Sequence, residues 1–141
     1  MNHSMISFPL TLQYAFKGLV FIAKNPAGKT INVQEIAEIE NLPSHFLGKI
    51  FQRLVLSNIL DSKRGPGGGY ILLKRPEQVH LLEVANSLMS YDGEKRECLF
   101  GLGACGEVEH CPIHGVVKTT EKEIEKLLED WTLLDLVNGK Q

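Results

Sequence analysis

The chain has 141 residues, of which 43% are hydrophobic and 23% charged, and its formal net charge is −2. This balance is typical of a soluble globular protein with room for one domain's worth of core. The longest apolar runs, such as residues 19–23, are far shorter than the roughly 20 residues that a membrane span needs. No secretory leader is visible, and we therefore expect a cytoplasmic protein.

The charges divide the chain into two unlike parts. Residues 1–75 carry nine Lys/Arg against four Asp/Glu, a net of +5, whereas residues 76–141 carry six against thirteen, a net of −7. The basic half suggests a polyanionic partner, and the acidic half suggests a different function. The alternative is an uneven distribution of charge with no functional role. We expect one functional region in residues 1–75 and a second in residues 76–141.

The first half predicts three helices. Apolar residues recur every three or four positions over residues 8–24, which predicts an amphipathic helix that stops at residues 25–28. Asn32 and Glu35 have the spacing of a capping box and predict a short helix over residues 33–40. After a turn at residues 41–43, Ser44 is expected to cap a third helix with these apolar residues: Phe46, Leu47, Ile50, Phe51 and Leu54.

Two short helices joined by a tight turn match a helix-turn-helix pattern. The polar face of the second helix would present His45, Gly48, Lys49, Gln52 and Arg53. Periodicity alone favours an ordinary helical hairpin with a solvated polar face, because such hairpins are common.

The next segment changes this balance. Residues 58–63 and 70–74 predict two strands on either side of a tip in which residues 65–69 are four glycines and a proline. Such a tip lets the backbone approach a phosphate or a groove wall closely. A plain flexible turn would not need Lys63 and Arg64 beside it, and no Gly-Lys-Ser/Thr follows to make a Walker A motif. We therefore predict a mainly α fold with a small β-hairpin wing: a winged helix-turn-helix.

The second half predicts two further helices. Val79, Leu82, Ala85, Leu88 and Met89 have helical spacing, and this helix should end near residues 91–93. A long helix should begin between residues 112 and 120 and carry one apolar stripe, formed by Ile124, Leu127, Leu128, Trp131 and Leu134. The stripe is either part of the chain's own core or a dimer interface.

All three cysteines lie in a glycine-punctuated loop between these helices. Six residues separate Cys98 from Cys105, five separate Cys105 from Cys111, and two separate Cys111 from His114. An odd, clustered set does not fit a secreted disulfide framework. Soft thiolates with an imidazole suit an iron–sulfur cluster or zinc equally, and a thiol redox switch is a further alternative.

Two further assignments fit the residues of this loop. His110 is a substitute for His114 as fourth ligand, although its position next to Cys111 would need a sharper bend. A Cys111/His114 nucleophile would make the chain an enzyme. No third orienting residue accompanies that pair, so we expect no enzyme.

Residues 42–54, LPSHFLGKIFQRL, and residues 63–72, KRGPGGGYIL, closely resemble the IscR/NsrR/CymR superfamily of winged-helix regulators. The resemblance runs from residue 10 to about residue 137, and the glycine-rich wing is its most specific part. It implies a homodimer, clasped by the long C-terminal helix, on double-stranded palindromic operator DNA. The implied DNA-binding residues are Tyr14, Ser44, His45, Phe46, Gly48, Lys49, Lys63, Arg64, Gly65, Pro66, Gly67, Gly68 and Gly69.

The resemblance also bears on the cysteine loop. The IscR branch has a similar Cys/His spacing and holds a 2Fe–2S cluster, although the first gap here is one residue longer. This implies one iron–sulfur cluster per subunit on Cys98, Cys105, Cys111 and His114, favours it over zinc, and suggests a repressor whose operator affinity depends on the cluster or its redox state.

Two residues depart from the resemblance. Gly48 stands where the IscR branch has a glutamate, which suggests a different or looser operator. Gln13 precedes Tyr14 where the nitric-oxide-sensing branch has a carboxylate, which argues against that branch's 4Fe–4S ligation.

Overall fold

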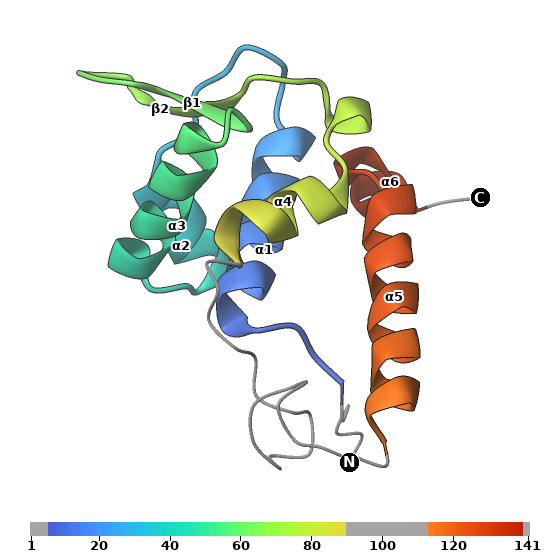
Figure 1. Ribbon diagram of the computed structural model, residues 1–141. Helices are drawn as coiled ribbons and strands as arrows, with labels where there is room; N and C mark the ends of the chain where they lie inside the picture. The colour runs from blue at the N-terminus through green and yellow to red at the C-terminus, as the bar shows by residue number, and fades with distance from the viewer. Residues whose placement is uncertain (1–5, 90–112, 140–141) are drawn as a thin grey trace.

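The computed structural model describes residues 6–89 and 113–139, which form one mainly helical body with a β-hairpin (Figure 1). In chain order the elements are α1 (Leu10–Lys24), α2 (Val33–Glu40), α3 (Ser44–Leu56), β1 (Leu60–Lys63), β2 (Gly69–Leu72), the 3-10 helix η1 (Pro76–Gln78), α4 (Leu81–Leu88), α5 (His114–Asp130) and α6 (Leu133–Asn138). No helix in these two ranges is long and apolar enough to cross a membrane. The predicted fold class, three helices followed by a wing, is confirmed.

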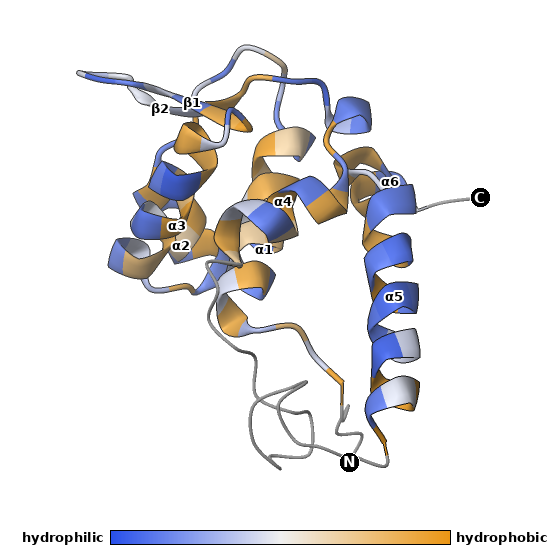
Figure 2. Ribbon diagram, viewed as in Figure 1, coloured by the Kyte–Doolittle hydropathy of each residue, from blue (hydrophilic) through white to orange (hydrophobic). Residues whose placement is uncertain are grey.

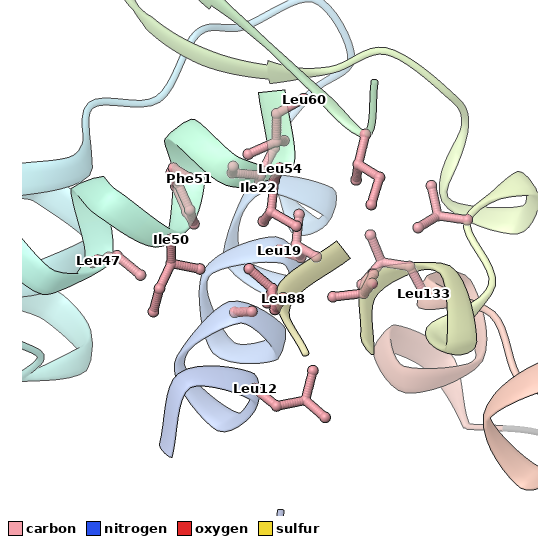
Figure 3. Packing of buried hydrophobic residues seen from close by; sticks show 14 of the residues in the cluster. Leu12, Leu19, Ile22, Leu47, Ile50, Phe51, Leu54, Leu60, Leu88 and Leu133 are labelled. Carbon is pink, nitrogen blue, oxygen red and sulfur yellow. The ribbon is translucent and has the colours of Figure 1, made fainter. Parts of the chain in front are cut away.

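One hydrophobic core joins both halves of the chain. Leu12 and Leu19 of α1, Phe51 of α3, Leu88 of α4 and Leu133 of α6 all belong to a single buried cluster (Figure 3). The hydropathy colouring shows the apolar sides of these helices turned toward one another and the polar side of α5 turned outward (Figure 2). Because this core includes residues from both sides of residue 75, the predicted division there concerns the functions of the two parts and not separate cores.

The helix-turn-helix differs from expectation at its caps. The Asn32 side chain accepts a hydrogen bond from the Gln34 N–H at 2.7 Å, which confirms Asn32 as the cap of α2. Asn41 ends α2 in the left-handed conformation, with φ 55°. Ser44 is not a cap: Pro43 holds that position without a side-chain bond, and Ser44 is the first helical residue. The Pro43 carbonyl already accepts from the Leu47 N–H at 3.0 Å, so the helix begins one residue earlier than its predicted cap implied.

The wing is a two-stranded antiparallel hairpin with a third segment beside it. Leu60 pairs with Leu72 and Lys63 with Gly69, so both strands are shorter than predicted. Ile31, from the α1–α2 connection, exchanges two backbone hydrogen bonds with Tyr70 of β2, at 2.9 and 2.8 Å. The Ile31 carbonyl approaches Gly69 so closely that a Cβ there would overlap it.

The C-terminal helices begin and end at other residues than the predicted apolar stripes implied. α4 ends at Leu88, earlier than expected, and Val79 is buried but lies before the helix. α5 begins within the expected interval but ends at Asp130, and Trp131 is extended.

A new helix start explains why the long stripe is broken. Thr132 and Asp135 form a capping box, with Thr132 N–H donating to Asp135 Oδ2 at 2.9 Å, and this box starts α6. The single stripe that included Trp131 and Leu134 was therefore wrong. Leu128 is 6% exposed and belongs to the chain's own core, whereas Leu127 is 49% exposed.

The close approach of Gly69 to Ile31 generates a stability prediction. Gly69→Ala should lower the free energy of unfolding by about 1–3 kcal/mol, because the added methyl forces the two Ile31–Tyr70 backbone bonds apart. Gly48→Ala is the matched control: nothing lies within 4 Å of its added Cβ. Inside α3 it should be neutral or stabilise by about 0.5–1 kcal/mol. Urea unfolding followed by circular dichroism measures both, and equal effects would contradict this account of the wing.

Candidate nucleic-acid interface

The N-terminal part of α3 and the wing line one open groove of 620 Å³. Both lie on the same side of the molecule, and α5 lies on the other side (Figure 1). The lining comes from the start of α2, from α3 and from the wing, and includes Asn32, Gln34, Ser44, His45, Gly48, Lys49, Gln52, Gly65, Gly68 and Gly69. The fold thus brings together most of the residues that the sequence predicted as DNA-binding.

The cations at this surface are available to an external partner. Lys49 on α3 and Lys63 and Arg64 on the wing are all exposed. Within residues 6–89 and 113–139, none of the three takes part in an ion pair. Asp61, the acid nearest in sequence to the two wing cations, accepts a hydrogen bond from the Ser62 N–H at 2.9 Å. The surface therefore presents unpaired positive charge, which a phosphate backbone would attract.

The tip of the wing is a type II turn. The Gly68 N–H donates to the Gly65 carbonyl at 2.9 Å, Pro66 fills the first central position, and Gly67 has φ 75° at the second. The Gly67 carbonyl also accepts a hydrogen bond from the Thr30 hydroxyl at 2.7 Å. These bonds give a defined backbone path to residues that the sequence predicted only as a permissive tip.

Aromatic contacts fix α3 against its neighbours. Phe51 of α3 meets Tyr70 of β2 edge to face, with ring centroids 5.1 Å apart. Phe46, one of the predicted DNA-binding residues, is 40% exposed and meets Tyr14 of α1 edge to face, with ring centroids 5.7 Å apart. Leu47, the next residue, is fully buried in the core. Tyr14 is thus placed behind the exposed start of α3; a DNA contact by Tyr14 itself stays a prediction.

Sequence reasoning missed several residues of this surface. Gln52 was predicted on the polar face of this helix but not among the DNA-binding residues, and it lines the groove one helical turn from Gly48 and Lys49. Asn32 and Gln34 reach the groove because α2 begins beside the base of the wing. Thr30 carried no sequence signal, since its partner is a backbone carbonyl 37 residues away.

The predicted metal ligands fall mostly outside the described residues. Cys98, Cys105, Cys111 and the substitute His110 all lie in residues 90–112, which the structure does not describe. His114 is described: it is the first residue of α5 and is half-buried. No group of three or more His, Cys, Asp or Glu suited to a metal occurs among the residues that are described. The Cys3His site stays a prediction.

Comparison with known proteins places the chain in a family. The Rrf2 family model, described as an iron-dependent transcriptional regulator, matches residues 10–139. An HTH-type transcriptional regulator of Aquifex aeolicus is 28% identical over 93% of this chain and 91% of its own length. The regulator IscR of Cronobacter sakazakii is 28% identical over 92% of this chain and 78% of its own length.

Solved structures agree on the fold. IscR of T. potens superposes with a TM-score of 0.74 at 20% identity, covering 94% of this chain and 87% of that one. CymR, the global cysteine regulator of B. subtilis, superposes with a TM-score of 0.73 at 20% identity, covering 97% and 100%. The groove, the wing and the match over residues 10–139 lead to one conclusion: the chain belongs to the Rrf2 family of transcription regulators, as its helix-turn-helix and wing sequences predict, and is not an enzyme.

Proposed function

We propose that this DNA-binding regulator binds a palindromic operator as a homodimer, and that a cluster in its Cys3His loop sets its operator affinity, with repression as the outcome. The observation that carries the DNA-binding part is the groove between the start of α3 and the wing, which Lys49 lines. Two further exposed cations, Lys63 and Arg64, lie next to it in the wing, and none of the three takes part in an ion pair among the described residues. The cluster rests on the ligand chemistry of the loop and on the family.

In this proposal α3 is the recognition helix. An α-helix fits the major groove of B-DNA, where its N-terminal residues contact base edges. His45, Phe46, Gly48 and Lys49 occupy that part of α3 and are at least partly exposed. Gly48 brings no Cβ, so the backbone can approach the duplex closely there.

The wing would hold the neighbouring sugar-phosphate surface. Arg64 would enter the minor groove, where the negative potential of A/T-rich DNA attracts a guanidinium. Lys63 would contact phosphate, which positions the protein without selecting a sequence.

These roles predict that replacing Lys63 and replacing Arg64 weaken DNA binding in different ways. Lys63→Ala should weaken binding to all duplexes similarly. It should also reduce the slope of log affinity against log salt concentration by about one, because one fewer counterion is released. Arg64→Ala should cost about 1–3 kcal/mol and relax the preference for A/T in the minor groove. Gel-shift titrations against duplexes selected from a random library, repeated at several salt concentrations, measure both.

The control for this pair is Lys126→Ala, which removes an exposed lysine of α5 on the far side of the molecule and should bind like the wild type. Absence of DNA binding in both the metal-loaded and the metal-free protein would refute the proposal.

The dimer proposal needs a different apolar face from the one that the sequence suggested. Leu128 is buried within the subunit, but Val116 and Leu127 of α5 are 65% and 49% exposed. They are about three helical turns apart and therefore share one face of the helix. A two-fold partner covering this face would place two copies of α3 on a palindrome.

Leu127→Asp should therefore dissociate the dimer while the subunit stays folded, because the carboxylate would be buried only in the dimer. Lys122→Asp places the same carboxylate at an exposed position of α5 that points well away from Val116 and Leu127, and it should leave the dimer intact. Analytical ultracentrifugation at micromolar concentration decides this. A monomeric wild-type protein would overturn the dimer, and equal effects of the two variants would overturn the assigned face.

A structural route connects α5 to the wing. The Glu129 carbonyl, near the end of α5, hydrogen-bonds with His80 Nδ1 at 2.9 Å, and the Trp131 carbonyl accepts from the Leu81 N–H at 2.9 Å. Glu83 on α4 then forms an ion pair with Lys74, two residues after β2. We propose that a movement of α5 is transmitted to the end of the wing through residues 80–83.

The donor set of the loop fits an iron–sulfur cluster. Thiolates of Cys98, Cys105 and Cys111 with the His114 imidazole are soft and borderline ligands that iron accepts. When bound, a cluster supplies sensitivity to iron supply or oxidation. In this chain His114 would transmit that change, because it is the first residue of α5.

Cys105→Ser should abolish the visible absorption of anaerobically purified protein, because a serine oxygen is a harder and poorer iron ligand. His114→Ala should leave a labile cluster, and His114→Cys should retain it more tightly. Gly115→Ala, which meets nothing within 4 Å, is the neighbouring control and should keep the spectrum. Iron and sulfide analyses accompany the spectra.

Each alternative has its own outcome in this experiment. Stoichiometric zinc without sulfide would replace the iron–sulfur proposal by a zinc site. Absence of metal, with reversible thiol oxidation that changes DNA affinity, would replace it by a thiol switch. An intact cluster in His114→Ala would overturn only the fourth ligand.

A further inference from the structure

We propose that Thr30, in the connection between α1 and α2, is a positioning residue for DNA binding, because its hydroxyl holds the tip of the wing in place. This inference rests on the proposed role of the wing in binding DNA. It assigns a function to a residue outside both the recognition helix and the wing.

The base and the tip of the wing are held very differently. At the base, Tyr70 exchanges two backbone hydrogen bonds with Ile31 and packs against Phe51, and the Leu73 N–H donates to the Ile59 carbonyl at 3.0 Å. The tip, residues 64–68, lies beyond these contacts. Among the hydrogen bonds of the described residues, the bond from Thr30 Oγ1 to the Gly67 carbonyl, at 2.7 Å, is the one that joins this tip to another element.

The geometry and surroundings of this bond suit it to restrain the tip of the wing. Its length is near the middle of the range for O–H···O hydrogen bonds. Thr30 has one side-chain torsion and is followed by Ile31, which is fully buried and paired with Tyr70, so the donor costs little ordering. The acceptor lies in a glycine-rich turn, whose backbone has more freedom to lose than any other kind.

The consequence concerns the two wing cations. Gly67 is three residues from Arg64 and four from Lys63, so fixing its peptide limits the positions that these side chains can take. A wing fixed before binding does not have to be ordered on the DNA, and affinity rises by the ordering cost that is avoided. Without the hydroxyl, the tip would open while the base stays paired.

Thr30→Val tests this, because it removes the hydroxyl but keeps the shape and branching of the side chain. We expect it to bind selected duplex DNA about threefold to tenfold more weakly, the effect of one lost hydrogen bond. Thr30→Ser keeps the hydroxyl and should restore most of the affinity. The matched control is Thr119→Val, which removes a similar bond from an exposed threonine of α5 to the Gly115 carbonyl, at 3.0 Å.

A second measurement needs no DNA. Lys63 and Arg64 are trypsin sites at the edge of the tip, and cleavage there follows the population of locally opened wing. Thr30→Val should speed the appearance of fragments cut after these residues by a similar factor, and cleavage after Lys126 on α5 should not change. Thermal unfolding of all variants checks that the subunit is folded.

The outcomes separate this inference from the proposed function. Faster cleavage and weaker DNA binding in Thr30→Val, both restored in Thr30→Ser, support it. Weaker binding with unchanged cleavage overturns it, because Thr30 would then act other than by holding the tip. Unchanged cleavage and unchanged affinity also overturn it, and so does a failure of Thr30→Ser to restore. If the wild type binds no DNA, the proposed function fails, while the cleavage rates still decide whether Thr30 holds the tip.

Discussion

The relation between α3 and the wing depends on one junction around Tyr70. Its ring packs edge to face against Phe51 of α3, and its backbone is paired with Ile31 on one side and with Ser62 of β1 on the other. Phe51 and Ile31 are both fully buried, so this junction is continuous with the core. Because packed cores do not deform continuously, α3 and the wing base are held as one unit, and the groove between them has a defined shape.

The acidic half of the chain is built onto the same core. Leu133 of α6 and Leu128 of α5 lie in the buried cluster with residues of α1 and α3, and α6 packs against α1. A displacement of α5 would therefore shift the helices that pack against α3. It would also act on the end of the wing through the Lys74–Glu83 ion pair. This arrangement suits a regulator in which a signal received on one side changes DNA affinity on the other.

Much of the fold of residues 1–75 was predictable from the sequence because its signals are local. The helical spacing, the Asn32 cap and the glycine-rich tip each act within a few residues, and the structure confirms them. The structure differs from the prediction where two short-range signals compete. Thr132 and Asp135 have capping-box spacing and break the long stripe, whereas Ser44 has the right chemistry for a cap but follows a proline that takes the position.

What the sequence could not supply is the long-range pairing that shapes the site. The bridge from Ile31 to Tyr70 and the bond from Thr30 to Gly67 join residues more than 35 positions apart, and neither has a periodicity or motif of its own. The sequence also could not predict whether Leu128 faces the core of the subunit or a partner. An apolar stripe on a helix has the same spacing in both cases. The cysteine ligands lie outside the described residues, so the proposed cluster rests on ligand chemistry and on the family.

The central claim is that α3 and the wing bind DNA together as one surface. Hydrogen–deuterium exchange of the full chain, with and without a duplex selected by binding, tests it most directly. The account predicts slower exchange on DNA binding in residues 44–49 of α3 and in residues 63–70 of the wing within the same complex. Protection confined to α5 and α6, or protection of the wing without α3, would contradict it.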